Sequence, residues 1–307
     1  MSVDGLTHHI SSRYNEDLQR LLSNVLAMGG LVERQLLQAV EAITDPDEEA
    51  VVRVAKGELR VNQLEREIDE DCSRILATRS PTASDLRLIL TILKTITDLE
   101  RIGDEGEKIA GIATRLAARE RPRNRYRELR NLGELVIGMV HDTLDAFARH
   151  DTELALEVLR RDRIVDEEYE SIHRQSITFM MEDPRWIRRA LDVMWVVRSL
   201  ERIGDHSKNV CEYLIYLVHG RDVRHVRIEE IERELSESGH GEAAESARSA
   251  PGGARPASAE PPGADSPAVQ PADGELSGGY AHVATLPAGG RPGMLGAAGL
   301  PSSAAGK

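Results

Sequence analysis

Aromatic residues are scarce in this chain of 307 residues: they make up 3% of it, whereas charged residues make up 30%. A core must therefore be built mostly from Leu, Ile, Val and Ala, a composition that favours helices over sheets. Cations are outnumbered too, with 39 Lys and Arg against 52 Asp and Glu. The formal net charge of −13 disfavours general binding to nucleic acid or to anionic lipid.

Cysteines and long apolar runs are also few. Cys72 and Cys211 lie in different halves of the chain, each inside an expected helix, which favours buried thiols in a reducing compartment over a disulfide. No apolar run reaches the ~18 residues of a membrane span, and the segment from Met1 to His9 lacks the features of a signal peptide. We therefore expect a cytoplasmic protein without a transmembrane segment.

The chain does contain an identical internal repeat. The six residues LERIGD at Leu99–Asp104 return at Leu200–Asp205, 101 residues later. This spacing is too long for a solenoid repeat of roughly 20 to 50 residues and suits a duplicated small domain. Each copy also carries a helical glycine, Gly103 or Gly204, which indicates a close approach of another backbone.

Apolar periodicity and turn residues predict three helices in each half. The first half has Tyr14–Thr44, a helix that starts at Asp45–Pro46 and runs to about Thr78, and Ala83–Arg119; the second has Tyr126–His150, a helix capped by Asp151 that runs to about Met181, and Arg185–Val218. The expected fold is all-α, with two tandem antiparallel three-helix bundles at residues 1–120 and 121–238.

The third helix carries two apolar seams, which indicates burial on two sides. The second of these seams contains Leu86, Leu90, Leu93 and Thr97 and continues into the LERIGD acids. Charges on such a seam are costly without a partner.

Residues 239–307 differ from the rest of the chain, because 9 of these 69 residues are Pro and 14 are Gly. Such a segment cannot bury enough apolar surface to offset its chain entropy, so we expect a disordered tail with a short helical stem at Val226–Ser236. The arginine-rich stretch from Arg119 to Arg130 is interpreted as a solvated linker or as a docking patch for an acidic partner.

Paired carboxylates are the main chemical signal. A Glu and an Asp four residues apart share one helix face, and each LERIGD copy contains such a pair. The pairs are Glu100 with Asp104 and Glu201 with Asp205. The second helix adds Glu65 and Asp69, and if it packs antiparallel to the third, four carboxylates converge on a site of hard oxygen ligands suited to Mg, Mn, Ca or oxidised Fe.

The corresponding site in the second half departs from this pattern. Tyr169 and His173 align with Glu65 and Asp69, which leaves Asp166 and Glu170 as displaced acids. We therefore expect the second site to be altered or weaker.

Other readings of these residues remain. The LERIGD motif could instead be structural, with Arg101 and Arg202 paired to acids on neighbouring helices. Glu170 with His173 forms only one of the two ExxH units of a di-iron site, and His141 beside Asp142 reads as an ordinary helix residue. Because no Gly-rich phosphate loop, Ser/His/Asp constellation or zinc spacing occurs, we do not expect an enzyme.

With two such units, the chain resembles the PhoU family of phosphate-transport accessory proteins over about Tyr14–Gly220. The matching stretches are VNQLEREI at Val61–Ile68, SDLRLILTILKTITDLERIGD at Ser84–Asp104 and ERIGDHSKNVCE at Glu201–Glu212. The resemblance implies a cytoplasmic regulator, often a homodimer. It would restrain uptake through the phosphate ABC transporter and its ATPase subunit, and convey the transporter's state to a sensor histidine kinase.

The resemblance also implies metal binding by the carboxylates Glu100, Asp104, Glu201 and Asp205. The expected cofactor is a divalent or ferric ion (Fe, Mn, Mg or Zn), whose identity stays open. Two alternatives remain: a carboxylate-metal enzyme acting on phosphate esters, and a purely structural bundle in which amides could replace the acids.

Overall fold

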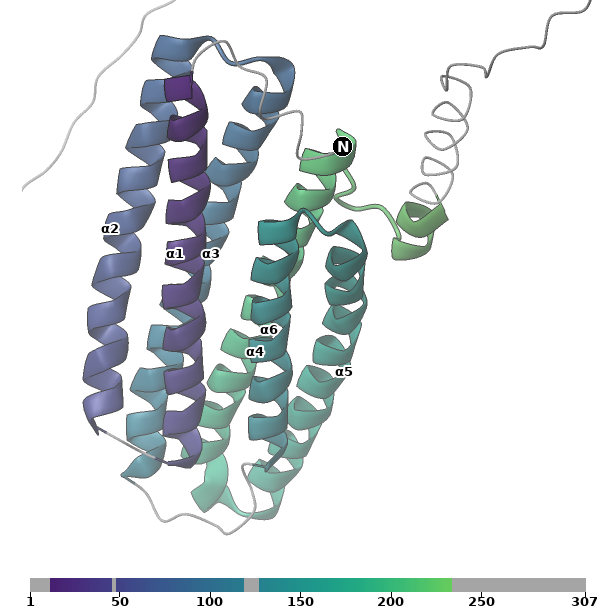
Figure 1. The fold of residues 1–307 in the computed structure, drawn as a ribbon. Helices are drawn as coiled ribbons and strands as arrows, with labels where there is room; N and C mark the ends of the chain where they lie inside the picture. Colours follow the sequence, from purple (N-terminus) through teal and green to yellow (C-terminus); the bar gives the residue numbers. More distant parts are fainter. Residues whose placement is uncertain (1–11, 46–47, 119–126, 234–307) are drawn as a thin grey trace, which may run out of the picture. The chain divides into compact units, whose positions relative to one another are not determined.

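The computed structural model describes residues 12–45, 48–118 and 127–233, and every long element in these ranges is a helix (Figure 1). The elements are α1 (Ser12–Thr44), α2 (Glu48–Arg79), α3 (Ala83–Ala117), α4 (Arg127–Arg149), α5 (Thr152–Glu182), the 3₁₀ turn η2 (Pro184–Trp186) and α6 (Ile187–His219). A further short helical turn starts at residue 228. Residue 46 of the expected proline turn, most of the arginine-rich stretch and the expected tail lie outside the described residues.

Helices α1, α2 and α3 pack on one another, and so do α4, α5 and α6 (Figure 1). This arrangement confirms the all-α fold of two tandem three-helix bundles. Local signals place the helix ends: the Asp151 carboxylate accepts hydrogen bonds from the backbone N–H groups of Glu153 and Leu154 at 3.1 and 3.0 Å. Gly220, with a φ of 72°, ends α6 in the left-handed conformation that glycine adopts readily.

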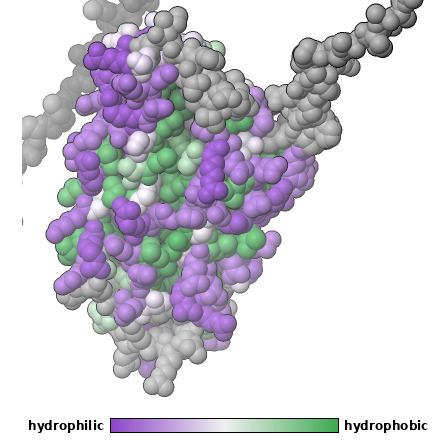
Figure 2. Space-filling model, in the orientation of Figure 1, coloured by the Kyte–Doolittle hydropathy of each residue, from purple (hydrophilic) through white to green (hydrophobic). Residues whose placement is uncertain are grey.

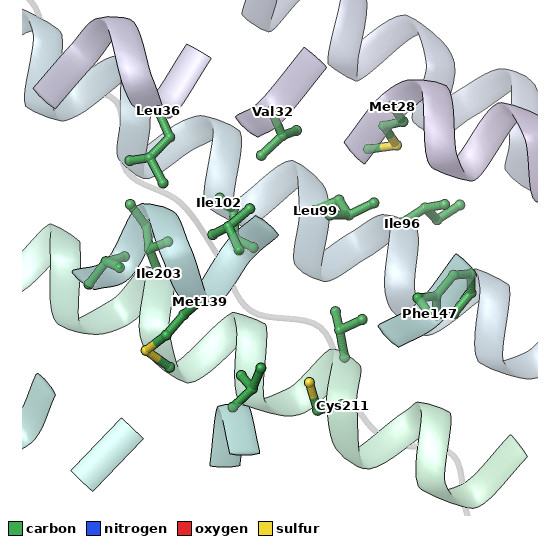
Figure 3. Close-up of a cluster of buried hydrophobic side chains, with 14 of the residues drawn as sticks. Met28, Val32, Leu36, Ile96, Leu99, Ile102, Met139, Phe147, Ile203 and Cys211 are labelled. Carbon is green, nitrogen blue, oxygen red and sulfur yellow. The ribbon is translucent and has the colours of Figure 1, made fainter. Parts of the chain in front are cut away.

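One continuous core joins the two bundles, because α1 packs on α4 and α3 packs on α6. Figure 3 shows buried side chains from these four helices pointing toward one another. They include Met28, Val32, Leu36, Ile96, Leu99, Ile102, Met139, Phe147, Ile203 and Cys211. Each such side chain contributes about 1.5–3 kcal/mol on burial, so the bundles stabilise each other.

Some apolar surface stays outside this core. Figure 2 shows hydrophobic side chains gathered along the middle of one face, bordered by hydrophilic ones. On α3, Leu86 and Leu90 are each 39% exposed, because α1, α2 and α6 cover other faces of this helix. The interpretation that the second seam of α3 is buried is therefore wrong at this end of the helix. Both cysteines, in contrast, are buried free thiols, as expected.

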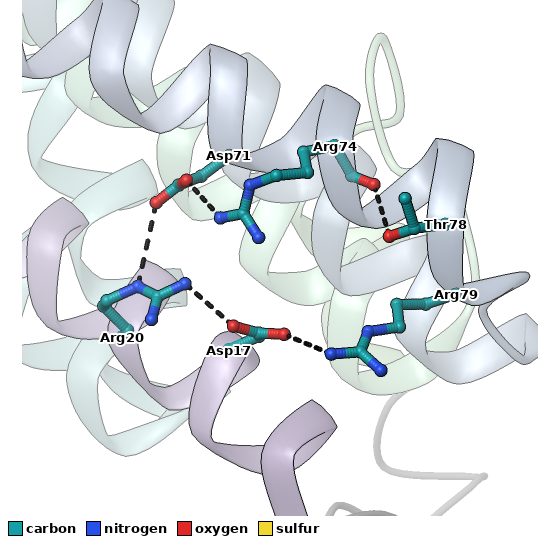
Figure 4. Close-up of polar contacts among 6 residues, drawn as sticks. All are labelled: Asp17, Arg20, Asp71, Arg74, Thr78 and Arg79. Atoms are coloured by element: carbon teal, nitrogen blue, oxygen red, sulfur yellow. Dashed lines mark hydrogen bonds and ion pairs between the residues drawn. The ribbon is translucent and has the colours of Figure 1, made fainter.

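An ion-pair network ties α1 to α2 (Figure 4). Asp17 accepts hydrogen bonds from Arg20 at 2.8 Å and from Arg79 at 3.1 Å, and Asp71 pairs with Arg20 and Arg74. Burial alone would raise the pKa of Asp17, but its hydrogen bonds from Arg79 and Arg20 hold this pKa below its usual value. The network therefore stabilises the first bundle in the charged state of its acids.

Glycines let α1 and α4 approach closely. A Cβ atom added at Gly29 would lie 2.3 Å from Leu144 Cδ2, and one added at Gly133 would lie 2.6 Å from Val40 Cγ1. Gly133 follows Gly29 by 104 residues, and Leu144 follows Val40 by the same interval. The contact is thus repeated with the roles of the two helices exchanged.

The same exchange holds between α3 and α6, which run antiparallel. Asp98 lies 2.6 Å from Nδ1 of His206, and Ser199 Oγ donates a hydrogen bond of 2.8 Å to Glu105. Ser199 and His206 follow Asp98 and Glu105 by 101 residues. Asn209 donates a further hydrogen bond to Asp98, and Arg202 forms an ion pair with Glu105; both acids are buried. The halves are therefore related by an approximate two-fold exchange.

Candidate functional site

Acidic side chains gather along the facing surfaces of α2 and α3. We define the first acidic cluster as Glu58, Glu65, Asp69, Glu100, Asp104 and Glu107. Burial, helped by the charges of neighbouring acids, raises the pKa values of Glu58, Glu65 and Glu100. The cluster is thus a group of carboxylates that repel one another in a partly buried setting.

Glu58 is the most deeply buried member, at 5% exposure. Its Oε2 accepts a 2.8 Å hydrogen bond from Nε2 of Gln35, whereas its Oε1 is buried and has no hydrogen-bond partner among the described residues. The neutral amide of Gln35 therefore satisfies one oxygen of the Glu58 carboxylate but does not neutralise the charge of that carboxylate. Sequence reasoning missed this acid, because Glu58 lies outside the ExxxD pattern.

The glycine of the first LERIGD copy makes room for this carboxylate. A Cβ atom added at Gly103 would lie 2.7 Å from Glu58 Oε2. The expected approach of a backbone is therefore wrong at Gly103, where a side chain is the neighbour. A backbone does approach one turn later, since Leu36 Cα would lie 3.9 Å from a Cβ at Gly106.

The predicted first-half residues lie near one another without forming a closed ligand set. Glu65 and Glu100 interact electrostatically across α2 and α3, Asp104 is half-buried, and Asp69 is exposed but still raises the pKa of Glu65. Among the described residues, no three His, Cys, Asp or Glu side chains are arranged to hold a metal as they stand. Metal binding by these four acids stays a prediction.

The second half repeats the arrangement with different chemistry. We define the second acidic cluster as Asp162, Asp166, Glu170, Glu201 and Asp205, together with Lys208. Asp162 is 3% exposed and accepts a 2.8 Å hydrogen bond from Nζ of Lys208. It lies beside Gly204, where an added Cβ would be 3.5 Å from its Oδ1.

Charge compensation differs within this cluster. Burial raises the pKa values of Asp166, Glu201 and Asp205, and the Lys208 ammonium opposes this rise for Asp166 and Asp205. Burial would lower the pKa of Lys208 itself, but its hydrogen bond to Asp162 raises that pKa overall. The second cluster therefore carries its own cation.

Tyr169 and His173, which align with Glu65 and Asp69, are neighbours on one helix. The rings of Tyr169 and His173 stand 5.8 Å apart on α5, and the Arg198 guanidinium lies 5.9 Å from the Tyr169 ring. Glu170 is exposed, and its ion-pair neighbour is Arg174 at 3.9 Å. This acid therefore lies at the exposed edge of the cluster, where its charge adds to burial in raising the pKa of Asp166.

A signal for the missed acids was present in the sequence. Asp162 follows Glu58 by 104 residues, the same interval that aligns Tyr169 with Glu65. Lys208 follows Glu107 by 101 residues, the interval of the LERIGD repeat. The structural reading of the arginines is supported at Arg202, whose Nη1 lies 2.8 Å from Glu105, whereas Arg101 contacts only its neighbour Glu100 at 3.5 Å among the described ion pairs.

Both clusters lie inside segments that match a known family. The model described as "PhoU domain" matches residues 25–113 and 129–214. The chain belongs to the PhoU family. The resemblance found in the repeated motifs is thereby confirmed, and each acidic cluster falls within one PhoU domain.

Proteins with similar sequences support the assignment to the PhoU family. The phosphate-specific transport system accessory protein PhoU homolog of Pseudomonas aeruginosa is 50% identical over 243 residues, which are 79% of this chain and 100% of the relative. The PhoU accessory protein of Escherichia coli is 45% identical over 232 residues, which are 75% of this chain and 95% of the relative.

Solved PhoU structures share the fold. The crystal structure of PhoU from Pseudomonas aeruginosa is similar with a TM-score of 0.66 and 50% identity, over 68% of this chain and 100% of that chain. The phosphate transport system regulatory protein PhoU from Streptococcus pneumoniae gives a TM-score of 0.63 at 29% identity, over 68% and 99%. In the described part of this PhoU-family chain, no helix is long and apolar enough to cross a membrane.

Proposed function

We propose that this PhoU-family chain is a cytoplasmic adaptor between the phosphate ABC transporter and a sensor histidine kinase. It would restrain phosphate uptake and repress the phosphate-starvation response when phosphate is plentiful. The observation that carries this proposal is the 50% identity to a phosphate-specific transport system accessory protein along that protein's whole length. The Streptococcus pneumoniae relative is named a phosphate transport system regulatory protein, which supports a regulatory role.

The chemistry of the described residues supports binding rather than turnover. Both thiols are buried, and burial raises the pKa values of Cys72 and Cys211 to about 12, so neither is a ready nucleophile. His206, beside the second cluster, is held by Asp98 at 2.6 Å. The partners we propose are the transporter's ATPase subunit, the kinase and a second copy of this chain as a homodimer.

We also propose that the acidic clusters hold a divalent or ferric ion. Glu65, Asp69, Glu100 and Asp104 would hold it in the first half; Asp166, Glu170, Glu201 and Asp205 are the weaker set in the second. The fit rests on a donor set made only of oxygens, on pKa values raised by burial and by repulsion between acids, and on the buried Oε1 of Glu58 and Oε2 of Glu201, which have no partner among the described residues. A bound cation would supply positive charge that offsets this repulsion.

Deletion of the protein in its host tests the adaptor role. In phosphate-rich medium, we expect a starvation-gene reporter to switch on and phosphate uptake to rise, and the wild-type chain to reverse both effects. A pull-down from cells grown in high phosphate should recover the transporter's ATPase subunit or the kinase. Unchanged reporter activity in the deletion strain would contradict the proposal.

The enzyme alternative needs a separate assay. If the purified chain hydrolysed a phosphate ester and Glu100→Gln abolished this activity, the result would contradict the adaptor proposal and indicate an enzyme. We expect no turnover that depends on this acid.

A further inference from the structure

A cavity of about 600 Å³ lies between α6 and the segment that follows it. Its volume falls in the range of small-molecule sites, roughly 300–1,000 Å³. Side chains of α6 line one wall, and residues 224–227 line the other. The cavity borders the second acidic cluster through Asp205 and Lys208, but its character is different.

Cationic side chains outnumber acidic ones in the lining. Five permanent cations face two acids, Asp205 and Glu212. The cations are Arg198, Arg202, Lys208, Arg224 and Arg227, with His206 and His225 beside them. Four of these cations pair with acids outside the lining: Arg198 with Glu201, Arg202 with Glu105, Lys208 with Asp162 and Arg224 with Asp222. The lining therefore offers an anion a concentration of charged N–H donors on two walls rather than a net positive charge.

Ion pairs with neighbouring acids fix the positions of the cationic side chains of α6. Arg202 pairs with Glu105, Lys208 with Asp162 and Arg198 with Glu201, at 2.8, 2.8 and 2.7 Å. The carboxylates of Glu105 and Asp162 are 3% and 4% exposed, so these two acids lie beneath the surface. An arginine has five N–H donors and a lysine three, so each pairing leaves donors available to a ligand.

The acid deepest in the lining offers little opposition to an anion. Burial raises the pKa of Glu212 to about 7, so this carboxyl is largely protonated below neutral pH. In that state it can donate a hydrogen bond instead of repelling a ligand.

We propose that this cavity binds a small anion that carries two or more phosphate groups. Arginine matches the geometry of phosphate oxygens with paired N–H donors, and four arginines lie on two separate walls. A single phosphate ion is far smaller than the cavity and would leave most of these donors unused. The inference rests on the cavity alone and does not depend on the adaptor proposal.

Calorimetric titration of the full chain tests the site, with inorganic tripolyphosphate as the probe. We expect saturable binding that weakens at least about tenfold in the Arg198→Gln, Arg227→Gln double variant. The control carries the same charge change on α1 and α2, as Arg34→Gln with Arg53→Gln, and should stay within about twofold of wild type. Orthophosphate should bind at least about tenfold more weakly than tripolyphosphate.

Three results would overturn the proposal. One is no saturable binding of tripolyphosphate at millimolar concentration, and another is equal weakening in both double variants, which would indicate general charge screening. The third is orthophosphate binding as tightly as tripolyphosphate. Arg198 and Arg227 are exposed and lie outside the core, so both variants should fold, and equal thermal midpoints would verify this.

Discussion

The two acidic clusters occupy corresponding places in the two bundles, yet among the described residues only the second pairs its buried acid with a cation. Lys208 of α6 pairs with the buried Asp162, whereas the first half has Glu107 at the corresponding position. There, the one hydrogen bond that the buried Glu58 side chain receives from the described residues comes from the neutral amide of Gln35. The two halves thus keep an acid at the positions of Glu58, Glu100 and Asp104 but differ in what compensates the buried one.

This difference strengthens the prediction that the first half binds a metal ion more tightly. The alignment bases that prediction on Tyr169 and His173, which stand where the first half has Glu65 and Asp69. The ammonium of Lys208 is a second reason, because it already occupies the neighbourhood of Asp162. A cluster with its own cation gains less from an added one.

The largest effect should follow the removal of Lys208. Lys208→Met leaves the Asp162 carboxylate buried without its cation, and we expect the free energy of unfolding to fall by about 3 kcal/mol. Urea denaturation near neutral pH measures it. The matched variant in the other half, Glu107→Met, removes a repelling charge and should change stability by less than about 0.5 kcal/mol. Equal losses in the two variants would remove the contrast between the clusters.

Metal binding should produce the next largest effect. A ligand at 100 times its dissociation constant adds about 2.7 kcal/mol to stability, so Mn²⁺ should raise the unfolding midpoint and a chelator should reverse the rise. We expect Glu100→Gln with Asp104→Asn to lose more bound metal, by elemental analysis, than Glu201→Gln with Asp205→Asn. A larger loss in the second-half variant, or a midpoint insensitive to chelation, would favour structural salt bridges instead.

The two LERIGD glycines offer a matched pair of substitutions. Alanine at Gly103 must displace the Glu58 carboxylate, whereas alanine at Gly204 meets its neighbours at 3.5 Å, an ordinary contact. Helix propensity favours alanine over glycine by about 1 kcal/mol in both places. We therefore expect Gly204→Ala to be more stable than Gly103→Ala by about 1 kcal/mol in thermal or urea unfolding. A Gly103→Ala variant at least as stable as Gly204→Ala would contradict the described position of Glu58.

The smallest effect concerns pH. The folded-state pKa values of Glu58, Glu65 and Glu100 are raised above 4.5, so their contribution to stability is complete below pH 4.5 and is lost as pH rises through the raised values. Glu107→Lys should offset that loss, adding about 0.5 kcal/mol at about pH 8 and little at about pH 4 in metal-free protein.

Denaturant unfolding at the two pH values provides the measurement for Glu107→Lys. Glu168→Lys makes the same charge change at an exposed position of α5 and should show no such difference between the two pH values. A gain of the same size in Glu168→Lys would assign the effect to net charge rather than to the first cluster.

Much of the fold could be predicted from the sequence, because apolar periodicity and caps such as Asp151 act locally. The helix ends agree with expectation to within about two residues, which is the usual scatter of boundary assignment. The exposure of Leu86 and Leu90 could not be predicted, since an apolar stripe does not say which neighbour covers it. The identity of the family was accessible because one motif occurs twice.

The candidate site was only partly accessible. The ExxxD spacing identifies Glu100 and Asp104, because residues on one helix face follow from the helical repeat. Glu58 and Asp162 are harder to find, since their importance comes from burial and from contacts with other helices. The pairing of Lys208 with Asp162 joins residues 46 positions apart and depends on how α5 meets α6. Side-chain reach between helices is a tertiary property that no local pattern encodes.

The exchanged contacts between the halves have an evolutionary consequence. A single three-helix ancestor could have paired with an identical copy through the same patches, each surface serving as its own partner. Fusion of the two copies into one polypeptide lets the two patches diverge, because a substitution in one half no longer appears in the other half. Asp98 can therefore face His206 while Glu105 faces Ser199, a combination that identical subunits could not have built.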